Sequence, residues 1–194
     1  MSEDPSEAAV EAKEKDRTVA LVIAILALLL ALAEAGAKRA QHLSTESNIE
    51  ASDLFNFYQA KRIRSTVAET AANLLEAQKS GIEDIKAQEA FDKQIEAFKT
   101  TVANFEHDPK KPEDSLEVIQ ERAQQAIERR ELANHRFERY ELGSGLSQIA
   151  IVLASAAIIT GIGALIWFSV TLGAIGAVLM ALGFFAPTVF NVLG

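Results

Sequence analysis

Two long apolar stretches, one near each end of the chain, dominate its pattern of hydrophobic and polar residues. The first runs from Thr18 to Ala33, and the second, from Leu142 to Gly194, contains no charged side chain. One helical crossing of a bilayer takes about 20 apolar residues. The first stretch therefore predicts one transmembrane helix, at residues 18–37. The second is long enough for a hairpin, residues 142–194, with transmembrane helices at residues 144–161 and 164–186.

The glycines of the second stretch indicate where this hairpin turns. We place the turn at Thr160-Gly161-Ile162-Gly163, because two glycines loosen a helix there and Trp167 follows at a position typical of an interfacial aromatic residue. A turn at Trp167 to Leu172 is the alternative. Pro187 disfavours helical backbone at the preceding residue, so it is expected to mark the end of the third span.

Between the apolar stretches, residues 38–141 have the pattern of water-exposed helices. A capping box at Ser47-Asn48-Ile49-Glu50 predicts a helix over residues 47–79. Its apolar positions recur along the helix: Leu54, Tyr58, Ile63, Val67, Ala71 and Leu74. Ser80 and Glu83 are expected to cap a second helix, over residues 81–106. This helix has a stripe with alternating steps of four and three residues: Phe91, Ile95, Phe98, Val102 and Phe105.

A third polar helix is predicted over residues 112–142. Pro112, followed by two acidic residues, suits a helix start. The helix carries apolar residues in heptad register, interrupted only by Arg130: Leu116, Ile119, Ala123, Ala126, Ala133, Phe137 and Tyr140. Narrow stripes of this kind suit packing within a bundle or pairing with other subunits, so a homo-oligomer is expected.

The overall prediction is an all-α protein. No segment alternates polar and apolar residues for long enough to indicate a strand. We expect an acidic leader over residues 1–17, three transmembrane helices, and a central polar region folded as a helical hairpin or coiled coil. A cleaved secretory signal is disfavoured, because the leader is acid-rich and Ala33-Glu34-Ala35-Gly36-Ala37 imitates a cleavage site only weakly.

Composition narrows the chemistry that the chain can perform. The formal net charge is -8, and no basic block is present that would attract a nucleic-acid backbone. There is no cysteine, and Glu131 with His135 lacks the Glu-x-x-His spacing of di-iron bundles. The sequence has neither a phosphate-binding loop nor a serine nucleophile with a nearby base. We therefore expect no enzyme activity, no cofactor and no bound metal.

Few polar side chains lie within the predicted spans. Glu34 ends the first apolar stretch and is expected to anchor in the headgroup region, the alternative being a place in the pore of an oligomer. Gln148, Ser155 and Thr160 are candidates for hydrogen bonds across helices. Small residues four positions apart permit close helix packing in three pairs: Ala150 with Ala154, Ala157 with Gly161, and Gly173 with Ala177.

Three segments resemble a known family. The motif ASDLFNFYQAKRIR over residues 51–64, the tripeptide Tyr140-Glu141-Leu142 and the run from Gln148 to Ser155 are similar to a bacterial membrane-protein family known only as domain of unknown function 4337. The family motif usually has Asn where Asp53 stands and Trp where Phe55 stands. The resemblance covers nearly the whole chain. It implies an integral protein of the bacterial inner membrane, and it implies no activity.

The first of these segments also offers a candidate binding face. Helical spacing brings aromatic, basic and acidic residues within a turn of one another, which suits an anionic lipid headgroup, an acidic protein partner or a phosphate-bearing ligand. In the alternative interpretation, the aromatic residues pack inside the bundle and the charges pair along the helix. The candidate face consists of Asp53, Phe57, Tyr58, Lys61, Arg62 and Arg64.

Two functions are compatible with these features. The favoured one is a non-enzymatic membrane scaffold, or partner-binding module, whose helices oligomerise; the alternative is an oligomeric pore-forming or transport-accessory subunit. An odd number of spans places the polar region and the C-terminus on the same side of the membrane. Lysines and arginines flank the polar region in excess, which favours a cytoplasmic location for it. The three basic residues of the leader, close to the first span, argue for the opposite orientation.

Overall fold

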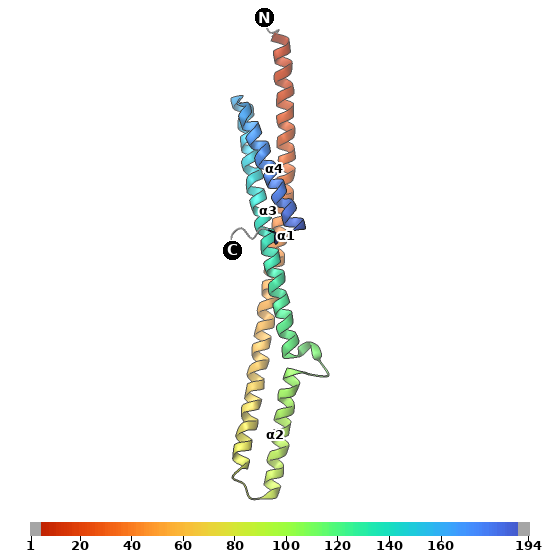
Figure 1. Ribbon diagram of the computed structural model, residues 1–194, viewed down its shortest axis with the longest axis vertical. Helices are drawn as coiled ribbons and strands as arrows, with labels where there is room; N and C mark the ends of the chain where they lie inside the picture. Colours follow the sequence, from red (N-terminus) through yellow and green to blue (C-terminus); the bar gives the residue numbers. More distant parts are fainter. Residues whose placement is uncertain (1–4, 190–194) are drawn as a thin grey trace. The chain divides into compact units, whose positions relative to one another are not determined.

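The computed structural model describes the backbone of residues 5–189 and the side chains of residues 17–189. In this part of the chain every regular element is helical and there is no strand, which confirms the predicted all-α class (Figure 1). The elements are α1 (Pro5–Lys79), α2 (Ile85–Glu106), the 3-10 turn η1 (Pro112–Asp114), α3 (Leu116–Thr160) and α4 (Gly163–Phe185).

Helix α1 is a single helix of 75 residues, and this corrects one expectation. We expected a helix to begin at Ser47, but Ser47 lies in the middle of α1. After Pro5 this segment contains one glycine, Gly36, and no proline, so nothing in it ends the helix. A capping box stabilises only a helix end whose backbone N–H groups lack partners. Inside α1 those groups are already bonded one turn back.

The connection from α1 to α2 also differs from the expectation. The cap of α2 is Asp84, whose side chain accepts a hydrogen bond from the Lys86 backbone N–H at 3.0 Å, and the helix begins at Ile85 instead of residue 81. Ser80 directly follows the last residue of α1, and its hydroxyl donates back to the Ala77 carbonyl at 2.7 Å. Both serine and aspartate are good caps. Here the turn at residues 80–82 separates Ser80 from the start of α2, so Asp84 is the residue next to the helix.

A folded connector, residues 107–115, joins α2 to α3. Within it the Lys110 N–H donates to the Asp108 carboxylate at 2.8 Å, and the Asp108 N–H donates to the Ser115 hydroxyl at 3.2 Å. Ser115 is 1% exposed, and its carbonyl accepts the first hydrogen bond of α3 from Ile119. The helix predicted to open at Pro112 therefore begins as one 3-10 turn, and the α-helix follows from Leu116.

The chain turns between α3 and α4 at the glycines chosen from the sequence. Gly161 has a φ of +72°, a conformation that favours glycine, and its N–H donates to the Ala157 carbonyl at 2.9 Å. The alternative turn at residues 167–172 is wrong, because those residues lie inside α4. Helix α4 ends at Phe185, two residues before Pro187, as expected.

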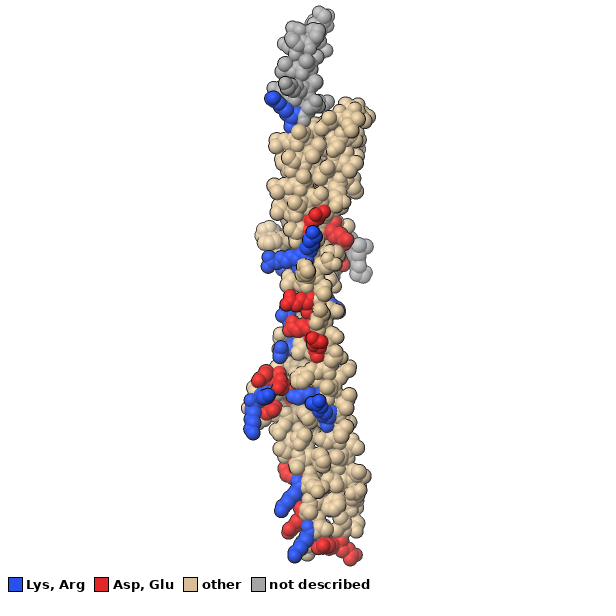
Figure 2. Space-filling model, turned by 180° about the vertical axis from the view of Figure 1, so that it is seen from behind, with Lys and Arg blue, Asp and Glu red and all other residues tan. Residues whose placement is uncertain are grey.

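The chain divides into two compact units. We call residues Met1–Thr45 with Glu131–Gly194 the span unit, and residues Glu46–Arg130 the polar unit. Among the described residues three helices, α1, α3 and α4, are long and apolar enough to cross a membrane. Figure 2 shows a long surface of the span unit without acidic or basic side chains, bounded at one end by a band of both.

Helices of the span unit pack through small residues. A Cβ added to Gly176 would lie 3.0 Å from the Gly143 carbonyl oxygen, so α3 and α4 are in backbone contact there. A Cβ at Gly173 would lie 2.3 Å from the Leu26 side chain, so α4 also contacts α1, there through a side chain. Three of the alanines that the sequence analysis paired are buried on α3: Ala150, Ala154 and Ala157. Small side chains allow this close approach.

In the polar unit, α1 packs against α2 and the beginning of α3. The less exposed residues of α1 recur at steps of four and three, and we call them the seam: Ser47, Ala51, Leu54, Tyr58, Lys61, Ser65, Ala68, Ala72, Leu75 and Lys79. The stripe predicted on α2 is also the less exposed face of that helix, with Ile95 6% exposed. Four of the positions predicted on α3 are buried in this unit: Leu116, Ile119, Ala123 and Ala126.

The apolar stripe predicted on α1 is corrected by this burial pattern. Leu54 and Tyr58 belong to the seam, but Ile63 and Val67 are 64% and 63% exposed. The step from Tyr58 to Ile63 is five residues, which turns about 500° and leaves the face that steps of three and four follow. The sequence interpretation had joined two different faces of one helix.

Candidate functional site

Lys61, in the middle of the family-like motif, is buried. It is 8% exposed, and its Nζ donates a hydrogen bond to the backbone carbonyl of Asp114, in the connector between α2 and α3. The same nitrogen lies 5.7 Å from the centroid of the Phe57 ring and 5.8 Å from that of Phe105. A carbonyl oxygen and two aromatic faces partly replace the water that the ammonium group loses on burial. Lys61 thus ties three segments of the polar unit together.

The rest of the predicted binding face does not come together. Asp53, Arg62 and Arg64 are exposed, whereas Tyr58 is half-buried in the seam. Asp53 and Arg62 are nine residues apart, which places them about 180° apart around the helix. Asp53 instead borders a shallow hollow of about 540 Å³ whose charged residues are all acidic, lined by Glu46, Ile49, Glu50, Asp53, Leu54 and Phe57. The residues of the candidate face are therefore distributed over more than one side of α1.

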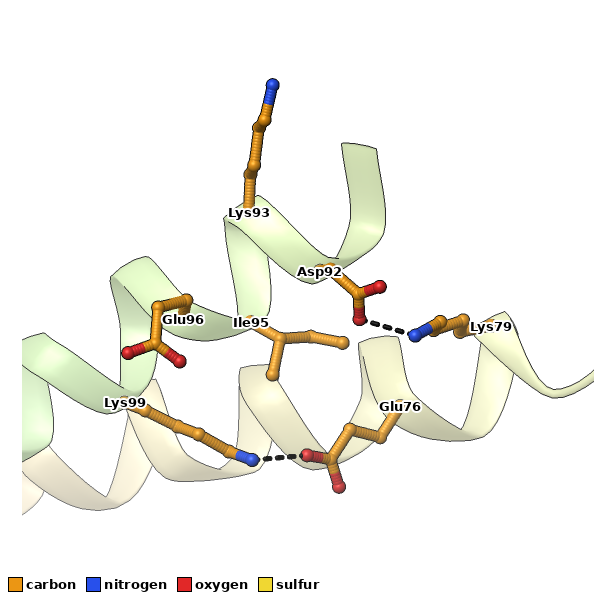
Figure 3. Close-up of a pocket in the computed structure, with 7 residues that line it drawn as sticks. All are labelled: Glu76, Lys79, Asp92, Lys93, Ile95, Glu96 and Lys99. Carbon is orange, nitrogen blue, oxygen red and sulfur yellow. Dashed lines mark hydrogen bonds and ion pairs between the residues drawn. The ribbon is translucent and has the colours of Figure 1, made fainter. Parts of the chain in front are cut away.

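A second hollow, of about 640 Å³, lies between the C-terminal end of α1 and α2 (Figure 3). Lys79 pairs with Asp92, and Lys99 pairs with Glu76 at 2.7 Å, on the two sides of Ile95. The hydrogen bond from Lys99 to Glu76, together with the charge of Glu76, raises the pKa of Lys99 above its ordinary value of 10.5. These exposed pairs link α1 to α2 at the surface.

A third hollow, of about 370 Å³, lies in the span unit and combines cationic with aromatic residues. Arg39 comes from α1, Arg136 and Tyr140 come from α3, and Phe184 comes from α4. A Cβ at Gly36 would lie 2.8 Å from the Tyr140 ring, so α1 and α3 are in close contact beside the hollow. We call it the boundary cavity, and its lining residues are Gly36, Arg39, Ala40, Leu43, Arg136, Tyr140 and Phe184.

The polar residues predicted within the spans bond along their own helix. Gln148 reaches Ser144, while Ser155 and Thr160 donate to the Ile151 and Ala156 carbonyls, each one turn back in α3. None of these three candidates donates to another helix in the hydrogen bonds of the described residues. Glu34 is exposed on α1.

A hydrogen bond between α4 and α3 comes from a residue that the sequence analysis did not select. Ser169 donates to the Ala150 carbonyl at 2.7 Å, and Ser169 is fully buried. Its signal in the sequence is a row of mostly small residues at steps of four and three along α4: Ser169, Gly173, Gly176, Met180 and Gly183.

A comparison with known protein families shows which family the chain belongs to. The family described as domain of unknown function (DUF4337) matches residues 15–186. The chain belongs to this family. No curated protein and no solved structure matches it. The match thus covers α1 from residue 15 onward and all of α2, α3 and α4, and it assigns no chemistry to any residue. Among the described residues, no group of three or more histidine, aspartate or glutamate side chains is placed to hold a metal ion.

Membership of DUF4337 does not by itself single out the boundary cavity, because Arg39 and Arg136 lie outside the segments that carried the resemblance. A local signal for this cavity exists in the sequence. Gly36, Arg39 and Leu43 share one helical face, and Arg136 and Tyr140 are four residues apart. These two short patterns form a site only when α1 and α3 lie side by side.

Proposed function

We propose that this DUF4337 protein is a non-enzymatic scaffold of the bacterial inner membrane, and that it self-associates through the part of α1 that lies in its polar unit. In this proposal three helices cross the membrane, and the polar unit lies on the cytoplasmic side, where flanking lysines and arginines favour it. The proposal is supported most directly by the apolar side chains on the outer face of α1.

Three large apolar residues form this face, and we call them the outer stripe. Ile63, Val67 and Leu74 are 64%, 63% and 58% exposed. They lie opposite the seam, since Ile63 and Leu74 are each nine residues from a buried seam residue, Ala72 and Ser65, which is about 180° of helix rotation. Exposure of such a stripe to water is unfavourable, because burying one Val, Leu or Ile side chain lowers the free energy by about 1.5–3 kcal/mol relative to leaving it in water.

Within the polar unit, the exposed apolar side chains of the outer stripe are larger than the apolar side chains that α1 fully buries. On α1 the fully buried apolar residues of this unit are alanines, Ala51, Ala68 and Ala72, while the larger residues of the outer stripe point outward. A lone helical hairpin gains most when its largest apolar side chains face inward. The opposite arrangement is expected when a second surface covers the outward face.

A second copy of the chain is the occupant that the geometry favours. Copies inserted in one membrane have the same orientation and depth, so their α1 helices are parallel and in register. The step of four residues from Ile63 to Val67, and of seven from there to Leu74, matches the heptad spacing of parallel helix pairs. Identical residues of two copies would then face each other.

Cysteine crosslinking in membranes tests this proposal, because the chain has no cysteine of its own. We expect Val67→Cys to form a disulfide-linked dimer when membranes are treated with a mild oxidant. Glu69→Cys is the matched control, since Glu69 is exposed and lies about 200° further around the helix. Equal crosslinking at both positions, or none at Val67→Cys, would refute self-association through the outer stripe.

A further inference from the structure

The boundary cavity lies where the apolar segments of the chain meet the charged ones. On α1 the apolar stretch ends at Ala33, a few residues before Arg39; on α3 the last charged residue before the apolar stretch is Glu141, one residue after Tyr140. Helix α4 ends at Phe185, next to the cavity residue Phe184. In an inserted protein this level corresponds to the lipid headgroups.

The lining of the cavity divides into a cationic part and an apolar part. Arg39 is exposed and Arg136 is half-buried, and of the described residues that line the cavity none is acidic. The apolar part includes Leu43, which is 40% exposed, and Phe184, which is 67% exposed. This combination matches a molecule with an anionic head and an apolar body.

One atom of the lining lacks a hydrogen bond. The Nε of Arg136 is buried and has no hydrogen-bond partner among the described residues. Leaving a buried charged donor unpaired is costly, and two guanidinium groups on one cavity repel each other. A phosphate group placed between the two guanidinium groups would offset their repulsion, because guanidinium groups bind phosphate through charge-assisted, often bidentate, hydrogen bonds.

We propose that the boundary cavity binds the phosphate group of an anionic phospholipid. In this proposal Arg39 and Arg136 hold the phosphate, Tyr140 donates its hydroxyl to the headgroup, and Leu43 and Phe184 contact the glycerol and the upper acyl chains. The inference rests on the proposed membrane insertion but not on self-association. It moves the lipid site from the motif around Lys61 to a different unit of the chain.

Lipid retention by the full-length protein tests this site. The protein is purified in a mild detergent, equilibrated with equal amounts of phosphatidylglycerol and phosphatidylcholine, and examined by native mass spectrometry. We expect phosphatidylglycerol to be retained in preference. Arg39→Gln combined with Arg136→Gln is expected to weaken its retention about tenfold, the loss of at least one charge-assisted contact. Equal retention of both lipids, or unchanged retention by the double variant, overturns the proposal.

The matched control is Lys38→Gln, which removes one positive charge at the same depth from a residue that does not line the cavity. It is expected to leave phosphatidylglycerol retention unchanged, and an equal loss in this variant would mean nonspecific attraction to anionic lipid. Added inorganic phosphate distinguishes a free anion, because displacement of the lipid by phosphate at millimolar concentration would contradict a lipid site. Disulfide crosslinking through Val67→Cys, measured in the variant that also carries Arg39→Gln and Arg136→Gln, tests self-association independently of lipid retention.

Discussion

The span unit and the polar unit expose large apolar side chains to a similar extent, yet the two exposures have different meanings. Leu21 and Phe168 of the span unit are 62% and 64% exposed, and Ile63 of the polar unit is 64% exposed. In the proposed membrane insertion, lipid covers the first two, and hydrocarbon is as apolar as the side chains themselves. Ile63 belongs to the polar unit, which the same proposal places outside the membrane. Exposure therefore becomes informative only when the surrounding solvent is known.

The buried polar groups separate the two units in the same way. In the described part of the span unit, the polar residues buried as whole residues are Ser144, Ser147 and Ser169, and two of these donate to backbone carbonyls, Ser147 to Gly143 and Ser169 to Ala150. The polar unit buries serines too, and in addition one charged residue, Lys61. A hydroxyl can be satisfied by one carbonyl at little cost, whereas an ammonium group needs several partners. The span unit is held by close packing of small residues, so we expect it to tolerate added side-chain volume poorly. The polar unit contains a buried charge, so we expect its stability to depend on the contacts of that charge.

The largest effect is expected from added volume between α3 and α4. In Gly176→Leu the new side chain would meet the Gly143 carbonyl at 3.0 Å and the Ser147 hydroxyl at 3.3 Å, both on the facing helix. Backbone cannot move aside as a flexible side chain can, so we expect a loss of about 3 kcal/mol or more, the upper end of overpacking costs. The thermal unfolding midpoint of the detergent-solubilised protein, followed by circular dichroism, measures it.

Gly145→Leu provides the matched control, because a Cβ at Gly145 meets nothing within 4 Å. This variant is expected to unfold at the same temperature or higher, since leucine favours helix over glycine by up to about 1 kcal/mol. If both substitutions lowered the midpoint equally, the close approach of Gly143 and Gly176 would not be what holds α3 and α4 together.

An intermediate effect is expected from removing the buried charge of the polar unit. Lys61→Met keeps the length of the side chain but leaves the Asp114 carbonyl without its donor, at a cost of about 1 kcal/mol. The connector should then open more often, which raises hydrogen exchange at Asp108, whose N–H is bonded to Ser115. Arg62→Met, on the exposed neighbour, should leave this exchange unchanged. Equal exchange in the two variants would show that Lys61 does not hold the connector.

The sequence predicted those features that depend on neighbouring residues alone. Apolar stretches of sufficient length identified the three candidate spans, and the glycines around Ile162 identified the turn. Where a helix starts depends also on whether the preceding segment is already helical. The capping box at Ser47 was read correctly as a pattern, but helix propagation from the preceding segment removes the need for a cap.

Features that depend on distant segments could not be predicted in this way. Lys61 is held by Asp114, 53 residues away in an irregular connector. The boundary cavity requires Arg39 and Arg136 to meet across two helices, and no local pattern states which helices are neighbours. The outer stripe was misassigned because a step of five residues was read as part of one face. A count of helix rotation would have separated it from the seam.

The smallest effect is expected at the surface of the polar unit, where Lys99 pairs with Glu76. Glu76 raises the pKa of Lys99 above 10.5, so the pair stabilises the folded protein while the lysine is protonated. This contribution is fully present below the ordinary pKa of lysine and is lost as the pH rises through the raised value. The pair is exposed and screened by water, so its effect is small.

A double-mutant cycle with Lys99→Met and Glu76→Gln isolates the coupling from the other lysines that titrate in this range. Unfolding of the full-length protein by urea should show a favourable coupling at about pH 8 that disappears near pH 12. A coupling of the same size at both pH values would mean that packing of the two side chains, and not their charge, joins α1 to α2 at this point.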